Sequence, residues 1–175
     1  MEEKGLIQVY TGDGKGKTTA SIGQAVRAKG HKFRVCFIYL FKHPEDFPYG
    51  ELEVLKELGI ETVSLVPHHP HFHRNISPEQ MREDCLKALE SIKKLFQGSY
   101  DMLVLDEILV ALQDKFLKEE EILELLNQKP SSLELILTGR GATKKIIEKA
   151  DLVTEMRKIK HPFTRGIKER RGIDY

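Results

Sequence analysis

The sequence has few cysteines, almost no excess of charge of either sign and no long apolar run, and each scarcity excludes a class of protein. Its 175 residues carry 28 Lys and Arg against 27 Asp and Glu, for a formal net charge of +1. A chain this close to neutral has no broad basic field to attract nucleic acid. No apolar run approaches the roughly 18 residues that a membrane-spanning helix needs. We therefore expect a protein that binds neither nucleic acid nor membrane.

The two cysteines indicate a reducing compartment rather than a disulfide or a metal site. Cys36 lies in an apolar run and Cys85 in an amphipathic helical pattern, and neither has the spacing of a metal ligand. This placement predicts two reduced, mostly buried thiols. The first ten residues, MEEKGLIQVY, lack the basic start and apolar core of a signal peptide. Both features favour a cytoplasmic location.

Short apolar runs alternate with helical patterns along almost the whole chain. Strands are expected at 6–11, 33–41, 62–66, 101–107, 133–139 and 151–156. Helices are expected at 18–29, 50–58, 118–127 and 143–150, with a longer one that begins after Ser77 as N-cap, Pro78 in the first turn and Gln80 placed for a capping box. This alternation predicts a single α/β domain, 1–175, with a mostly parallel sheet of about six strands and helices on both faces.

The stretch YTGDGKGKTTAS, residues 10–21, predicts a phosphate-binding loop. It follows an expected strand and opens an expected helix, although Thr11 stands where the common pattern has its first glycine. Glycines let successive N–H groups face phosphate oxygens, and the helix N-terminus adds its positive end. The expected nucleotide-binding residues are Gly12, Asp13, Gly14, Lys15, Gly16, Lys17, Thr18 and Thr19. Lys17 would reach the outer phosphates, and the Thr18 hydroxyl would ligate Mg²⁺.

Two further groups are expected at the same edge of the sheet. Asp106 and Glu107 end an apolar strand, where nucleotide-binding proteins place the acids that serve Mg²⁺. The alternative interpretation is a strand end followed by a helix N-cap, which Asp often provides, but the neighbouring phosphate loop favours the metal site. The residues alone do not decide which carboxylate contacts the metal. Arg140 follows another strand between two glycines. Arg27, near the end of the first helix, is either a nucleotide contact or a charge that complements the helix dipole.

A loop rich in histidine and proline, PHHPHFH at 67–73, follows the third expected strand. Imidazole is a common metal ligand, so one interpretation is a contact to a metal or to a metal-bearing ligand. The spacing lacks the paired ligands of a closed zinc site, which favours a solvated loop stiffened by proline.

Six blocks read together resemble the P-loop type of ATP:corrinoid adenosyltransferase. They are YTGDGKGKTTAS, VRAKGH, LVLDEI, LILTGRGA, ADLVTEM and KHPFTRGIKERRGIDY, in the family's order and extending to the last residue. The resemblance implies a three-layer P-loop NTPase-like (RecA-like) fold. It also implies that Co(I) of a reduced corrinoid attacks the ribose C5′ of ATP and that the whole triphosphate leaves. It places the basic C-terminal segment near the nucleotide or a dimer neighbour.

The resemblance also assigns roles to residues. Residues 12–19 would bind the phosphates, Glu107 and Thr18 would serve Mg²⁺, and Lys17 and Glu107 would be catalytic. Arg27 and Arg140 are expected to contact the nucleotide because of their positions in the sequence. ATP is the implied co-substrate, a corrinoid the second substrate, a flavoprotein reductase the electron donor and a homodimer the assembly.

The chain departs from the family pattern in the corrin-binding region. The family usually has a Gly-Phe-x-Trp stretch after the third strand, where this chain has PHHPHFHRNIS with Phe72 as the only Phe, Tyr or Trp. Phe72, His71 and His73 are the expected corrinoid contacts. Two alternatives therefore stay open, another P-loop kinase or ATPase and a nucleotide-gated corrinoid-binding protein.

Overall fold

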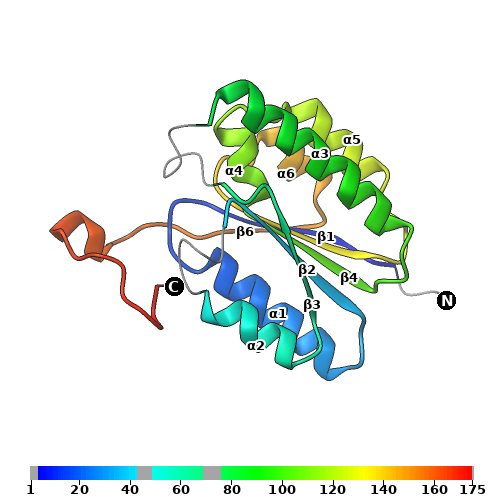
Figure 1. The fold of residues 1–175 in the computed structure, drawn as a ribbon, viewed down its shortest axis with the longest axis horizontal. Helices are drawn as coiled ribbons and strands as arrows, with labels where there is room; N and C mark the ends of the chain where they lie inside the picture. Colours follow the sequence, from blue (N-terminus) through cyan, green and yellow to red (C-terminus); the bar gives the residue numbers. More distant parts are fainter. Residues whose placement is uncertain (1–3, 43–48, 69–75, 175) are drawn as a thin grey trace.

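A computed structural model describes residues 4–42, 49–68 and 76–174, and its centre is a sheet of six parallel strands (Figure 1). The strands are β1 (Ile7–Thr11), β2 (Val35–Leu40), β3 (Glu61–Leu65), β4 (Met102–Asp106), β5 (Glu134–Thr138) and β6 (Leu152–Glu155). Their order across the sheet is β3-β2-β4-β5-β1-β6, and every adjacent pair is parallel. All six expected strands are confirmed.

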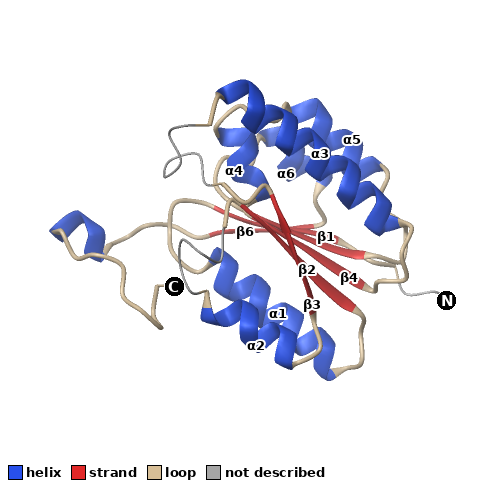
Figure 2. Cartoon of the chain, in the orientation of Figure 1, coloured by secondary structure: helices blue, strands red, loops and turns tan. Residues whose placement is uncertain are grey.

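Helices cover both faces of this sheet, as Figure 2 shows. On one face lie α1 (Lys17–Gly30) and α2 (Gly50–Glu57). On the other lie α3 (Pro78–Phe96), α4 (Ile108–Gln113), α5 (Glu119–Asn127) and α6 (Lys144–Lys149). The three-layer α/β architecture expected from the sequence is therefore confirmed. Within the described ranges, no helix is long and apolar enough to cross a bilayer.

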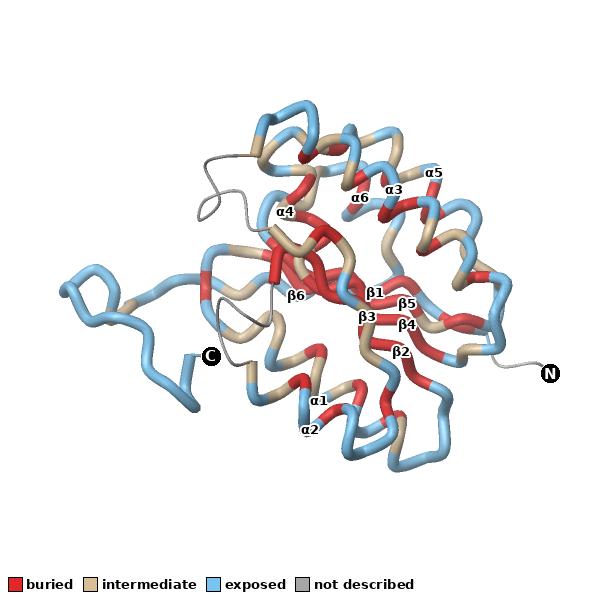
Figure 3. Tube along the Cα trace, in the orientation of Figure 1, coloured by how far each residue is buried: buried red, intermediate tan, exposed pale blue. Residues whose placement is uncertain are grey.

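The central strands read as continuous apolar runs because both of their faces are covered. In β2, Ile38 and Leu40 face the core beneath α3, whereas Phe37 and Tyr39 face the core beneath α1 and α2. Every residue of β1, β2 and β4 is buried, and the exposed positions concentrate on the edge strands β3 and β6 (Figure 3). Alternation of side chains across a strand explains this division into two cores.

Both cysteines are free and buried, as the sequence predicted. Cys36 lies in β2 and Cys85 on the buried face of α3, and burial raises the pKa of each thiol to about 12. These thiols therefore stay protonated and act as small apolar groups in the core.

Two sequence expectations about helices need correction. The Ser77 side chain caps α3 by accepting from Gln80 N at 3.1 Å, but the Gln80 side chain donates to Asp84, so the reciprocal half of the capping box is not formed. The expected elements also include no helix between the fourth strand and residue 118, whereas α4 begins at Ile108. Its sequence ILVALQ continues the apolar run of β4, and so short a run does not distinguish a helix from a strand.

Candidate functional site

The carboxyl ends of β1, β4 and β5 meet at one edge of the sheet and border a cavity of about 680 Å³. Residues of three expected groups line it: the loop after β1, Glu107 after β4 and Arg140 after β5. The segment after β6 closes the remaining side, from Arg157 through His161 to Asp174. The structure thus brings together the phosphate loop, one of the two acids and one of the two arginines.

The glycines of the loop are required by the segment that follows β6. Gly14 N donates to Met156 O at 2.6 Å, and Met156 N donates to Thr11 O at 2.8 Å. A Cβ on Gly12 would lie 2.5 Å from Met156 O, and one on Gly14 would lie 2.6 Å from the same atom. Gly12 also has a φ of 101°, which L side chains rarely adopt. The backbone after β6 therefore fixes the path of the loop.

The start of α1 presents backbone donors and one lysine to the cavity. The helical hydrogen-bond ladder begins with Ala20 N donating to Gly16 O at 2.8 Å, so the N–H groups of the first turn precede it. The Lys17 ammonium donates to Gly12 O and Gly14 O, both at 2.7 Å. Burial and the nearby Arg140 charge lower the pKa of Lys17. A half-buried cation beside helix N–H groups is a site for an anion.

The two acids at the end of β4, Asp106 in its last position and Glu107 directly after it, have different surroundings. Asp106 is fully buried, its Oδ2 pairs with Lys42 Nζ at 2.7 Å, and its Oδ1 accepts from Thr138 Oγ1 at 2.7 Å. Glu107 is partly exposed and lines the cavity. Both oxygens of Asp106 are thus engaged by protein groups, whereas Glu107 faces the space in which a ligand would lie.

Glu107 occupies an unusual backbone conformation at the N-cap position of α4. Its φ is 66°, and its N–H donates to Thr138 Oγ1 at 2.9 Å. Burial raises the pKa of Glu107 to about 7, while Lys42, Lys17 and Arg140 oppose that rise. This carboxyl group therefore sits among three cations that favour its ionised form.

The C-terminal segment contacts the loop directly. Lys15 Nζ donates to Ile173 O at 2.6 Å and pairs with the Asp174 carboxylate. Arg170 Nε pairs with the same carboxylate at 3.0 Å. Hydrogen bonds from Lys15 and Arg170 hold the pKa of Asp174 well below its usual range. The expectation that this basic segment lies near the nucleotide loop agrees with its position.

Other expected residues lie elsewhere. Arg27 is exposed in the last turn of α1, where its Nη1 donates to Gln24 Oε1 at 3.3 Å, and the structure does not bring it to the cavity. Phe72, His71 and His73 lie outside the described residues. Lys42, Thr138 and Met156 were not singled out from the sequence, although a lysine directly after a buried strand was a usable signal for the first of them.

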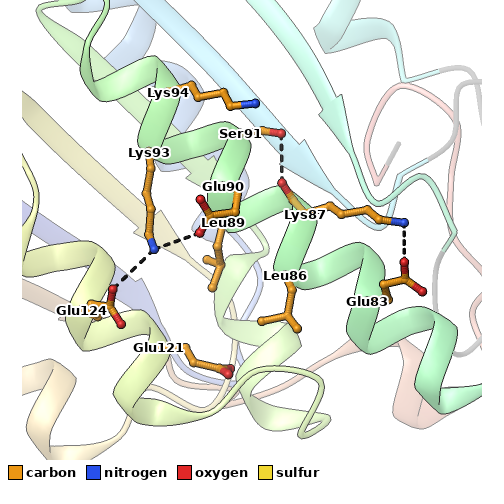
Figure 4. A pocket seen from close by; sticks show the side chains of 10 residues that line it. All are labelled: Glu83, Leu86, Lys87, Leu89, Glu90, Ser91, Lys93, Lys94, Glu121 and Glu124. Carbon is orange, nitrogen blue, oxygen red and sulfur yellow. Dashed lines mark hydrogen bonds and ion pairs between the residues drawn. The ribbon is translucent and has the colours of Figure 1, made fainter.

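A second hollow lies between α3 and α5, and no residue of the phosphate loop lines it (Figure 4). Five of its charged side chains pair among themselves: Lys87 with Glu83 at 2.8 Å, and Lys93 with Glu90 at 3.0 Å and Glu124 at 3.5 Å. Exposed pairs of this kind are ordinary on helix surfaces. Among the described residues, no group of three or more His, Cys, Asp or Glu side chains is arranged to hold a metal ion.

A glycine loop that opens a helix after β1, with acids where β4 ends at the same edge of a parallel sheet, is the arrangement typical of a P-loop protein. Comparison with known proteins narrows this class. The family model described as ATP:corrinoid adenosyltransferase BtuR/CobO/CobP matches residues 3–175. The chain belongs to the ATP:corrinoid adenosyltransferase family.

Three relatives show how far the similarity extends. The corrinoid adenosyltransferase of Escherichia coli strain K12 is 37% identical, over 100% of this chain and 88% of that protein. The corrinoid adenosyltransferase CobA of Salmonella typhimurium is 36% identical over the same shares. A corrinoid adenosyltransferase of Sinorhizobium sp is 35% identical, over 99% of this chain and 82% of that protein.

Proposed function

We propose that this protein transfers the 5′-deoxyadenosyl group of ATP to Co(I) of a corrinoid and releases triphosphate. The observation that carries the proposal is the cavity in which the phosphate loop, Glu107 and Arg140 meet, in a chain of this family. We further propose cob(I)alamin or cob(I)yrinic acid a,c-diamide as the acceptor. A homodimer and a flavoprotein reductase as electron donor rest on the resemblance to the family alone, whereas a cytoplasmic location is also supported by two free, buried cysteines.

The reaction makes one bond and breaks one. The electron pair of Co(I) forms the cobalt–carbon bond at C5′, and the C5′–oxygen bond breaks with its pair going to the triphosphate. The leaving group therefore gains negative charge as the bond breaks. Donors that are already in place where this charge develops stabilise the transition state more than the ground state.

The loop supplies such donors. Lys17 has three N–H groups, of which two donate to Gly12 O and Gly14 O, so the third is left for a phosphate oxygen. The N–H groups of the first turn of α1 lie next to it, and Arg140 borders the same cavity. These groups would bind the triphosphate and hold it in line with the corrin.

The residues at the site fit Mg²⁺, which the family implies. Mg²⁺ takes oxygen ligands and uses only one or two carboxylates beside water and phosphate oxygens. Glu107, which lines the cavity, would supply a carboxylate, and Thr18, in the first turn of α1, would supply a hydroxyl. Bound there, the ion would neutralise charge on the departing phosphates. We place Asp106 behind Glu107 rather than on the metal, because Lys42 and Thr138 already engage its two oxygens.

Product analysis tests this function against the two alternatives. The protein would be incubated anaerobically with ATP, Mg²⁺ and chemically reduced corrinoid, and the phosphates would be identified by ³¹P NMR. The proposal predicts intact triphosphate together with the spectrum of an alkyl-cobalt corrinoid. ADP would indicate phosphoryl transfer by a kinase or ATPase, and nucleotide-dependent corrinoid binding with neither product would indicate a delivery protein.

A further inference from the structure

Lys42 is a buried lysine at the carboxyl edge of the sheet. Lys42 comes shortly after β2 and directly after Phe41, whose φ is 59°. Only 7% of Lys42 is exposed. Its Nζ lies 2.7 Å from Asp106 Oδ2 and 5.5 Å from the centre of the Tyr49 ring. Burial disfavours the charge on Lys42, but the attraction of Asp106 and Glu107 outweighs it and raises the pKa of Lys42. Lys42 and Asp106 therefore form a buried ion pair in which each charge depends on the other.

The hydroxyl group of Thr138 connects this ion pair to the backbone of Glu107. Thr138 is fully buried, and its Oγ1 donates to Asp106 Oδ1 at 2.7 Å. A hydroxyl has a single hydrogen, so Thr138 Oγ1 must meet the Glu107 N–H with a lone pair, and it does so at 2.9 Å. The Asp106 carboxylate, paired with Lys42, can only accept hydrogen bonds. It therefore orients the Thr138 hydroxyl so that a lone pair faces the Glu107 N–H.

This chain of contacts holds Glu107 in a conformation that the backbone alone disfavours. Lys42, Asp106 and Thr138 come from the ends of β2, β4 and β5, which are neighbours in the sheet. Glu107 has a φ of 66°, a left-handed conformation that is unfavourable for a residue other than glycine and persists only where surrounding contacts impose it. The contact to Thr138 acts on the backbone of Glu107 and leaves its carboxylate free for the cavity.

We propose that Lys42 is a positioning residue: through Asp106 and Thr138 it holds Glu107 where the carboxylate contacts the metal of the bound nucleotide. This inference rests on the proposed function, because it assumes that Glu107 serves a metal. It gives Asp106 the role of a counter-ion for Lys42, and it adds Lys42 and Thr138 to the machinery of the site.

The test measures metal affinity and stability separately. Mn²⁺ would replace Mg²⁺, and the electron paramagnetic resonance signal of free Mn²⁺ would give its dissociation constant from the complex of the full-length protein with ATP. The variants are Lys42→Met and Thr138→Val. The matched control is Lys129→Met, since Lys129 Nζ donates to Gly5 O, Pro130 O and Leu133 O at 2.7–2.9 Å at the opposite, amino-terminal edge of the sheet. Thermal unfolding would be recorded for all three.

The proposal predicts that Lys42→Met and Thr138→Val each weaken Mn²⁺ binding by about 10- to 100-fold, as removal of groups that orient a metal ligand commonly does. Lys129→Met should unfold at a lower temperature and keep the Mn²⁺ affinity of the wild type. Lower unfolding temperatures with unchanged Mn²⁺ affinity in Lys42→Met and Thr138→Val would overturn the positioning role. If Lys42→Met does not fold, Thr138→Val decides, because it only exchanges a hydroxyl for a methyl group. Formation of ADP by the wild type would refute the proposed function, whereas the Mn²⁺ affinities would still decide whether Lys42 positions Glu107.

Discussion

Replacing Gly14 with alanine tests whether the segment after β6 shapes the phosphate loop. A Cβ at this position would lie 2.6 Å from Met156 O, 2.8 Å from Met156 C and 2.9 Å from Arg157 C. All three atoms belong to the backbone, so no side-chain rotation relieves the contact. Gly14 is not among the residues with positive φ, so the cost of the substitution is steric rather than conformational. The loop and Met156 must therefore separate, and the hydrogen bond from Gly14 N to Met156 O must lengthen or break.

Overpacking a buried position costs about 1–3 kcal/mol, which for a domain of this size lowers the midpoint of thermal unfolding by roughly 2–12 °C. Gly14→Ala should also weaken ATP binding, because the loop has moved. Gly23→Ala is the matched control: Gly23 lies inside α1, and a Cβ there meets nothing within 4 Å. Alanine is the better helix former by about 1 kcal/mol, so this control should stabilise the protein and leave ATP affinity unchanged.

The assays are calorimetric unfolding and titration with ATP. An unfolding midpoint and an ATP affinity for Gly14→Ala that both equal those of the wild type would refute the close approach of Met156. If Gly23→Ala lowers the unfolding midpoint and the ATP affinity as much as Gly14→Ala does, the effect is general to glycine substitution in this region. That result would also refute the steric argument.

Three further predictions concern charges at the site. Lys17→Met should weaken ATP binding about 10- to 100-fold in equilibrium titration, because a charge-assisted hydrogen bond to phosphate is lost; equal affinity would remove Lys17 from the site. The folded state raises the pKa of Glu107 from 4.5 to about 7, so it holds this proton more tightly than the unfolded chain does. In metal-free protein this contribution to the free energy of unfolding should be complete below pH 4.5 and lost as the pH rises to about 7. Glu107→Gln should flatten this pH dependence in denaturant titrations, and the same pH dependence in wild type and variant would refute the assignment to Glu107. Asp174→Asn should raise ATP affinity about two- to fivefold, because it removes an anion that competes with phosphate for Lys15; weaker binding would show instead that the tail supports the nucleotide.

The sequence predicted the strands well because each is a compact apolar run bounded by polar or turn residues. All six strands match to within two residues at either end, as the first shows with 6–11 expected and Ile7–Thr11 observed. Period and turn signals are local, so they are readable without the fold. The order of the strands is not local, and nothing in the sequence indicated that β5 would lie between β4 and β1.

The residues of the site also divide into those with local sequence signals and those that come together only in the fold. The phosphate loop and Glu107 were found from motifs that are continuous in the sequence. The partner of Asp106 was not, because Lys42 lies 64 residues away and meets it only when β2 and β4 pair. Met156 was missed for the same reason: its contact to Gly14 depends on the pairing of β1 with β6. Helix α4 was missed because its apolar residues extend the run of the strand before it.

The stoichiometry of a single turnover decides whether the triphosphate leaves intact as the cobalt–carbon bond forms. Protein in excess over reduced corrinoid would be mixed anaerobically with ATP and Mg²⁺, and both triphosphate and the cobalt–carbon bond would be counted. We expect one intact triphosphate for each alkyl-cobalt corrinoid formed, and none when the corrinoid is left oxidised. ADP and orthophosphate in place of triphosphate, or triphosphate released without a cobalt–carbon bond, would contradict this mechanism.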